Sequence, residues 1–427
     1  MEKSRKPKIR FKGFTDDWEQ RELGEFGKAT GGTSIESEFS EDGIYMVISI
    51  GSYSENSIYN DQGIRAIKSD KTSNRVLNKD DLTMILNDKT TSGNIIGRVL
   101  LIEKSGIYVY NQRTERIEIN RNKYDSLFLY EMLNAPNIRE KIIKQAQGNT
   151  QIYVNWSAIA MLDYMIPSKK EQIEIGQFLH SISNLITLHQ RKLDKLINVK
   201  KSMLEKMFPK QGSTVPEIRF SGFTNDWEQR EFIEIFDCTI PNNTLSRSEL
   251  SYDEGSILNI HYGDILIKYG SVLDTHKFEI PRVPNKKIED FRGSLLRPGD
   301  IVIADTAEDE TTGKACEIGS LFGNSIVAGL HTMVARPNIE MASGYLGYYL
   351  NSNAYHCQLL PMMQGIKVLS LSRANVKKTA LKFPESTKEQ QLIANYFIQL
   401  DDLITLHQCE LEKLQNIKIS MLEKMFV

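Results

Sequence analysis

Hydrophobic residues recur every three or four positions along two long stretches of the chain, residues 171–207 and a copy that ends at residue 426. The mean step of about 3.5 residues is that of the seam of a left-handed coiled coil, and the first stretch would form a helix about 55 Å long. The seam positions are Ile182, Ile186, His189, Leu193, Leu196, Met203, Leu400, Ile404, His407, Leu411, Leu414 and Met421. A single helix cannot bury such a stripe. Antiparallel pairing of the two copies within one chain is the simplest solution, although the pattern does not distinguish it from pairing between chains.

These two helices are part of an internal repeat. The sequence "LITLHQRKLDKLINVKKSMLEKMF" (185–208) returns as "LITLHQCELEKLQNIKISMLEKMF" (403–426), with six differences in 24 positions. The phrase "PKIRFKGFTDDWEQRE" (7–22) returns as "PEIRFSGFTNDWEQRE" (216–231), with three differences in 16 positions. The segments between these repeats diverge. We therefore expect one scaffold, made twice, that carries two different variable segments.

The variable segments have the pattern of mixed α/β domains. The first contains candidate strands at 44–50, 82–86, 94–102 and 116–119, and the second at 256–261, 264–269, 300–304 and 332–336. Each continues into a helical stretch, 125–146 or 343–363, and Pro136 is expected to split the first of these. Trp18 and Trp227 of the repeated phrase are interpreted as packing anchors between each segment and its long helix.

Size and composition are those of an ordinary globular protein. The 427 residues suit two or three domains, and the net charge of −2 does not indicate a nucleic-acid binder by itself. No apolar run is long enough to cross a bilayer, and the basic N-terminus lacks the apolar core of a secretory signal. The four cysteines form no Cys-x-x-Cys pair, which favours reduced thiols and a cytoplasmic location.

Catalytic signatures are missing from the sequence. There is no Gly-x4-Gly-Lys-[Ser/Thr] phosphate loop and no Pro-Pro dipeptide, so the Asn/Asp-Pro-Pro-aromatic signature of amino-methyltransferases is absent. The acidic run 308–310 is interpreted as a solvated loop rather than a metal site. His189 and His407 are interpreted as polar seam residues that fix register, with metal binding or a pH switch as the alternative. We expect no catalytic residue and no bound metal or cofactor in this chain.

Polar loops at corresponding places in the two variable segments are the candidate binding sites. Loops 87–94, 110–116 and 147–153 have counterparts in the second segment, and they offer Arg, Lys, Asn and Gln side chains that match base edges in the DNA major groove. The candidate DNA-binding residues are Asn87, Lys89, Thr90, Thr91, Asn94, Gln112, Arg113, Asn149, Thr150, Gln151, Tyr262, Lys268, Tyr269, Lys314, His331, Lys367 and Arg373. Each alone is more typical of a solvated surface, and only the grouping favours binding.

This organisation resembles the specificity subunit of Type I restriction–modification systems. The resemblance is carried by "IRFxGFTxDWEQRE", by "SMLEKMF" at the helix ends, and by the helix entries "IPSKKEQIEIGQFL" and "FPESTKEQQLIANYF". It covers the whole chain and both repeats. It implies an α/β chain with two globular α+β target-recognition domains, related by a pseudo-two-fold repeat and separated by a pair of long antiparallel coiled-coil helices. The corresponding boundaries are 1–168, 169–209, 210–385 and 386–427.

The resemblance also implies a function. Each domain would read one half of an asymmetric bipartite site in double-stranded DNA, while the helices set the spacing and dock two modification (methyltransferase) subunits. Restriction subunits, which translocate and cleave DNA, would join them. S-adenosylmethionine, ATP and Mg²⁺ would belong to these partners, and no membrane is involved.

Two other functions fit the residues less well. A stand-alone DNA-modifying enzyme would need a site of unfamiliar type, and turnover by the purified chain without partners would reveal it. A coiled-coil adaptor that binds only proteins would not need loops rich in Asn, Gln, Thr and Arg. A DNA-binding assay of the partner-bound complex separates this protein-binding adaptor from a DNA-reading subunit.

Overall fold

The computed structural model describes residues 6–89 and 92–427. The chain forms two compact units of mixed helix and sheet: Met1–Arg191 with Gln408–Val427 is unit 1, and Lys192–His407 is unit 2. Each unit contains a part of both long helices, α5 (Lys169–Lys206) and α11 (Thr387–Met425). We call the sheet-bearing part between β1 and β11 head 1 and the part between β12 and β23 head 2. None of the described helices combines the length and apolarity needed to span a bilayer.

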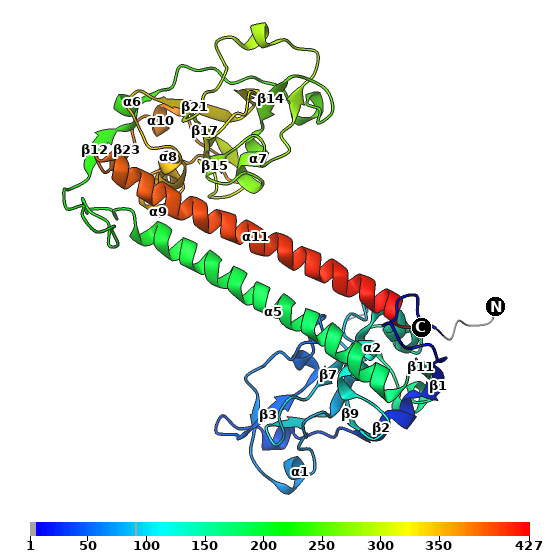
Figure 1. Ribbon diagram of the computed structural model, residues 1–427. Coiled ribbons are helices and arrows are strands. Elements are labelled where there is room, and N and C mark those ends of the chain that lie inside the picture. The colour runs from blue at the N-terminus through cyan, green and yellow to red at the C-terminus, as the bar shows by residue number, and fades with distance from the viewer. Residues whose placement is uncertain (1–5, 90–91) are drawn as a thin grey trace. The chain divides into compact units, whose positions relative to one another are not determined.

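Head 1 is built on an antiparallel sheet of order β2-β9-β5-β7 and a smaller sheet of order β4-β3-β8, in which β3 and β8 run parallel. Helix α2 lies against β7, and its hydrophobic residues join the unit's main core (Figure 1). The strands are β1 (Glu19–Glu22), β2 (Gly27–Gly31), β3 (Tyr45–Ile48), β4 (Arg65–Ala66), β5 (Leu82–Ile85), β6 (Asn87–Asp88), β7 (Val99–Leu101), β8 (Tyr108–Tyr110), β9 (Thr114–Ile119), β10 (Ile152–Tyr153) and β11 (Asp163–Ile166). The helices are α1 (Asp70–Ser73), α2 (Ser126–Asn134), α3 (Pro136–Ile143) and α4 (Trp156–Ile159). Pro136 is the first residue of α3, as expected from the sequence.

Head 2 repeats this topology and adds one strand, β15, which pairs parallel with β19. Its larger sheet has the order β13-β21-β17-β19-β15 and its smaller sheet the order β16-β14-β20, again with the last pair parallel. The strands are β12 (Glu228–Glu231), β13 (Phe236–Asp237), β14 (Ile257–Ile260), β15 (Val272–Leu273), β16 (Arg282–Val283), β17 (Ile301–Ala304), β18 (Thr306–Ala307), β19 (Ala315–Ile318), β20 (Ser325–Ala328), β21 (Thr332–Pro337), β22 (Leu369–Ser370) and β23 (Ala380–Phe383). The helices are α6 (Phe232–Ile235), α7 (Tyr262–Ile267), α8 (Tyr345–Leu350), α9 (Asn353–His356) and α10 (Arg373–Val376). The two diverged sequences therefore keep one frame.

Two strand predictions need correction. The segment 264–269 is not a strand but lies largely in helix α7. Ile265 and Tyr269 are buried while Ile267 is 89% exposed, which is the spacing of a helix rather than strand alternation. The predicted strand 94–102 is formed only at β7, because a chain reversal with Gly97 in the left-handed region (φ 71°) precedes it.

The repeated phrase forms the same socket in each unit. Strand β1 pairs with β11, the strand that leads into α5, and β12 pairs in the same register with β23, which leads into α11. Trp18 and Trp227 are buried in the main core of their units, which confirms their interpretation as packing anchors. The phrase is therefore repeated because it closes each head onto the start of a long helix.

A buried ion pair completes each socket. Arg10 donates from Nε and Nη2 to both carboxylate oxygens of Glu171, at 2.6 and 2.8 Å, and Arg219 binds Glu389 at the same two distances. Both glutamates lie in the first turn of a long helix, and their side chains are 0% and 1% exposed. The paired geometry of the guanidinium suits a carboxylate that water cannot reach.

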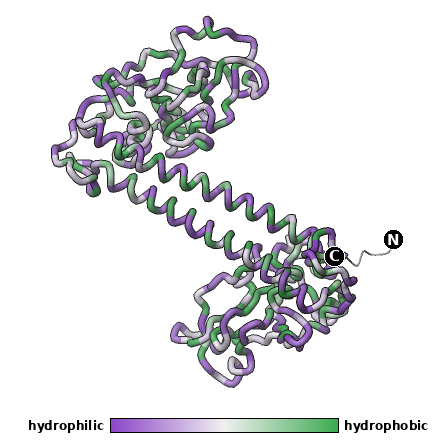
Figure 2. Tube along the Cα trace, in the orientation of Figure 1, coloured by the Kyte–Doolittle hydropathy of each residue, from purple (hydrophilic) through white to green (hydrophobic). Residues whose placement is uncertain are grey.

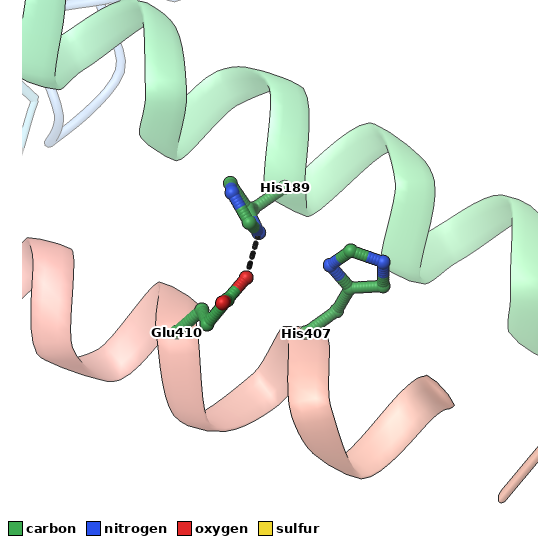
Figure 3. Close-up of side chains that lie close together, drawn as sticks. All are labelled: His189, His407 and Glu410. Carbon is green, nitrogen blue, oxygen red and sulfur yellow. Dashed lines mark ion pairs between the residues drawn. The ribbon is translucent and has the colours of Figure 1, made fainter. Parts of the chain in front are cut away.

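Within each unit the parts of the two long helices run antiparallel. In unit 1, His189 pairs with Glu410 at 3.2 Å (Figure 3) and Ser183 accepts a hydrogen bond from Lys418. In unit 2, Lys200 pairs with Asp401, and Phe208, which follows α5, stacks on Phe397. Hydrophobic and hydrophilic residues alternate along both helices (Figure 2). Of the seam residues, Ile182, Leu193, Leu400, His407 and Leu411 are buried, and Ile186, His189, Leu196, Met203, Ile404, Leu414 and Met421 are half-buried.

The socket ion pair can be tested with Arg219→Ala. The variant leaves the carboxylate of Glu389 buried without its cation, and we expect the free energy of unfolding to fall by about 3–5 kcal/mol. Urea unfolding followed by circular dichroism measures this change. The matched control is Arg230→Ala, which removes an exposed pair with Glu228 and should lower the free energy of unfolding far less. Equal losses for the two variants would contradict a structural role of the buried pair.

Candidate nucleic-acid interface

Three of the loops selected from the sequence meet at one edge of the head 1 sheet. Leu86, directly after β5, donates its backbone N–H to the carbonyl of Arg113 at 2.9 Å. The carbonyl of Leu86 accepts a hydrogen bond from Val154, also at 2.9 Å. The loop after β5, the turn before β9 and the hairpin 147–153 are therefore tied to one residue.

Head 2 repeats this junction with Asp305 in the place of Leu86. Its N–H donates to the carbonyl of His331 at 3.1 Å, and its carbonyl accepts from Leu371 at 2.8 Å. The predicted correspondence between the two sets of loops is thus a correspondence of backbone hydrogen bonds. The side chains that the two heads place on this edge differ.

Each head carries a tight hairpin at this edge. Gln147 and Tyr153 exchange two backbone hydrogen bonds of 2.9 Å, and Gln364 and Ser370 exchange two of 3.0 and 2.8 Å. The residue after each glutamine is a glycine with φ of 100° or 125°, and a Cβ there would lie 2.2 or 1.9 Å from a carbonyl oxygen across the turn. Only glycine fits these positions, so the sequence pair Gln-Gly marks the start of both hairpins.

The turn before the last long strand is strained in both heads. Arg113 has φ of 70° and His331 has φ of 54°, the left-handed region that costs most residues about 1–2 kcal/mol. Both side chains are exposed. Two unrelated residues held in the same unfavourable conformation at matching points of two heads indicate that the turn aims a side chain outward.

The other candidates of head 1 lie around this edge. Asn87 is half-buried in β6, Lys89 is exposed, and Thr90 and Thr91 lie outside the described residues. Asn94 donates its side-chain amide to Glu55 at 2.8 Å, and Gln112 donates to Glu36 at 3.4 Å. The exposed residues Asn149, Thr150 and Gln151 form the tip of the hairpin.

The candidates of head 2 divide by exposure. Tyr269 is 2% exposed and packs on Phe278, so its ring does not reach the surface. Lys314 donates to the carbonyl of Leu266 at 2.8 Å, and burial lowers the pKa of its ammonium. Three further candidates are half-buried: Lys268 donates to the carbonyl of Glu279, Arg373 donates to the carbonyl of Cys238, and Tyr262 packs edge-on against His331. Lys367, like His331, is exposed.

Residues missed by the sequence analysis hold the junction in shape. Arg139 donates from one nitrogen to the carbonyls of Gly93, Asn94 and Ile96, which fixes the loop after β5. The side-chain amide of Asn134 pairs with both backbone groups of Val99, and Asn351 pairs in the same way with Ala315. In the sequence each of these asparagines follows a leucine, as Leu133-Asn134 and Leu350-Asn351, and this shared pair is the signal that could have found the second contact.

A second repeated contact lies across the sheet of each head. Asp81 is paired with Arg116 at 2.9 Å, and Asp300 is paired with Arg336 at 2.6 Å. All four residues are buried or half-buried. Asp81 and Asp300 each stand directly before a strand, β5 or β17, but nothing in the local sequence marks their arginine partners on β9 and β21.

Glu115 is a buried acid beside the strained turn. It lies two residues beyond Arg113 in β9, is 6% exposed, and faces Gly31 and Met84 on the neighbouring strands. Among the described residues, none donates a hydrogen bond to its carboxylate. Burial raises the pKa of Glu115 to about 7, and the charge of Arg75 offsets part of this rise.

This pKa predicts a pH-dependent effect of Glu115→Gln. The folded state disfavours the charged carboxylate. The free energy of unfolding of the wild type is therefore undiminished by Glu115 below about pH 4.5, and it falls as the pH rises through 7. At pH 8 the variant should be about 1–3 kcal/mol more stable than wild type, and at pH 4 the difference should vanish. Thermal unfolding across this range measures it, with Glu118→Gln, an exposed acid on the same strand, as control. A difference that does not change with pH would contradict the assignment.

Comparison with known proteins finds similarity to one family. Residues 15–198 match the family model described as Type I restriction modification DNA specificity domain. The chain is similar to the Type I restriction enzyme MjaVIII specificity subunit of Methanocaldococcus jannaschii, with 23% identity over 418 residues, which are 94% of this chain and 90% of that protein. The fold is similar to the S subunit of a Type I restriction–modification system from M. genitalium, with a TM-score of 0.59, 16% identity and 99% of each chain covered. Residues 15–198 therefore match a Type I restriction modification DNA specificity domain, and the chain over nearly its whole length is similar to a specificity subunit of such a system.

Proposed function

We propose that the two heads read the two halves of an asymmetric bipartite site in double-stranded DNA. The observation that carries this proposal is the repeated junction of loops, in which Leu86 and Asp305 make the same backbone hydrogen bonds. One frame with different side chains is what two readers of different sequences need, because base edges are recognised by side-chain chemistry. Each base pair contributes about 1–3 kcal/mol of discrimination, so two heads multiply the specificity of one.

The reading surface in each head consists of the loop after β5 or β17, the strained turn at Arg113 or His331, and the hairpin tip. In head 1 we assign Lys89, Arg113 and the tip residues 149–151 to this surface. Arg113 suits the two acceptors of guanine, and the amides of Asn149 and Gln151 suit adenine. In head 2 we assign Tyr262, His331 and Lys367 to it. Tyr269 is buried, and the half-buried Lys314 already donates to the carbonyl of Leu266, so both are left out.

The long helices set the distance between the half-sites and dock the partner subunits. Support comes from exposed leucines that lie outside the seam. Leu185 and Leu188 are 44% and 60% exposed, and their repeat equivalents Leu403 and Leu406 are 43% and 51% exposed. Exposed apolar residues repeated on two helices indicate two equivalent contacts with protein partners. Two modification subunits would make these two contacts, and restriction subunits would join the complex for cleavage. The chain itself is non-catalytic, and the partner subunits bind S-adenosylmethionine, ATP and Mg²⁺.

Exchange of one head tests the proposal. Residues 30–165 are replaced by the same segment of another specificity subunit, and methylated adenines are mapped genome-wide in cells that carry the modification subunits. We expect a change in one half-site only, because the second head is untouched. The gap between the half-sites should stay the same, because both helices are retained. A change in both halves, or in neither, would show that the heads are not independent readers.

A further inference from the structure

The hairpin tips of the two heads carry opposite chemistry in the same backbone frame. Head 1 presents the polar residues Asn149, Thr150 and Gln151, all exposed. Head 2 presents Ile366, Lys367 and Val368. Ile366 is 101% exposed and contributes nothing to the core, and Val368 is 51% exposed and contributes only in part.

Single exposed hydrophobic residues are common, and exposure alone does not indicate a site. Three observations connect Ile366 to the reading surface of head 2. It follows Gly365, whose φ of 125° only glycine adopts readily, so the turn places its neighbour at a fixed point. The hairpin pairs through β22 with β18, directly after Asp305, and thus belongs to the junction of reading loops. A further exposed residue, Ile267 (89%), ends α7, which contacts the same strand β18.

We propose that the hairpin tip of head 2 reads thymine by packing Ile366 against the C5-methyl group in the major groove. This inference rests on the proposed function of head 2. Thymine is the only base of unmodified DNA that presents a methyl group in that groove, and apolar side chains recognise it by contact. Lys367, next to Ile366 at the tip, supplies a cation for the adjacent phosphate backbone. Head 1 has no apolar residue at the three tip positions and reads through amides instead.

Uracil substitution tests the contact directly, because it removes the methyl group and leaves the hydrogen-bonding edges intact. The complex with modification subunits is titrated with duplexes in which uracil replaces thymine only in the half-site assigned to head 2. We expect wild type to bind these duplexes about fourfold more weakly for each methyl group that Ile366 no longer covers, the value for one buried methyl-sized group. Ile366→Ala should bind the thymine duplex about fourfold more weakly than wild type and show no further weakening with uracil.

Phe322→Ala is the matched control. Phe322 is also exposed (64%), but it lies in the turn after β19, at the opposite end of the sheet from the loop that follows β17. This variant should keep the full response to uracil. Because Ile366 is fully exposed, its truncation removes no internal packing, and a folding defect does not complicate the comparison.

Several results would overturn the inference. Equal responses of wild type and Ile366→Ala to uracil would do so, as would a half-site without thymine on either strand. A 2-aminopurine signal of base unstacking that requires Ile366, without a response to uracil, would replace thymine reading by intercalation. These failures leave specific binding to the bipartite duplex intact. If the wild-type complex bound all duplex sequences equally well, that result would instead reject the proposed function itself.

Discussion

A buried carboxylate in the first turn of each long helix holds each head closed onto that helix. The side chains of Glu171 and Glu389 are withdrawn from water, and each is bound by the Nε and Nη2 of one arginine. An ionised group in such a place is tolerated only when its partner is held in position. The arginine comes from the repeated phrase, whose next segment pairs as a strand with the strand before the helix. The ion pair thus joins the two boundaries of each head.

The neighbouring glutamines add to the same joint. Gln172 accepts from the N–H of Asp125 and donates to Pro167, while Gln390 accepts from Ala342 and donates to Pro384. The sequence Lys-Glu-Gln at the start of each long helix therefore serves the helix, the core and the preceding turn together. Its repetition leaves the intervening head free to diverge, because the joint makes few demands on the loops at the other edge of the sheet.

Much of this architecture was predictable from the sequence. The long helices have an unbroken period, and strands such as β5, β9, β17 and β21 have apolar or alternating patterns, so both were found. Helix α7 was mistaken for a strand because its short apolar run has no clear period, and its capping contact, in which the His261 ring accepts from the N–H of Gly263, depends on three-dimensional geometry. The frame contacts of Asn134 and Asn351 were visible only as weak similarity between the halves.

The candidate site was predictable as a set of loops but not as a surface. The strain at Arg113 and His331, the burial of Tyr269 and the raised pKa of Glu115 depend on packing that no local pattern shows. Conversely, the glycines that shape both hairpins were in plain sight, and their role required the carbonyl that each Cβ would strike. Local propensity identifies elements, whereas the use of a side chain follows from what surrounds it.

Photo-crosslinking from the hairpin tips shows which half-site each head contacts. A photoreactive amino acid is placed at position 150 or at position 367, and the complex with modification subunits is irradiated on a duplex containing the full site. We expect each position to crosslink to bases of one half-site only, and the two positions to crosslink to different half-sites. Crosslinks from both tips to the same half-site, or to protein partners without DNA, would contradict the claim that one frame carries two different readers.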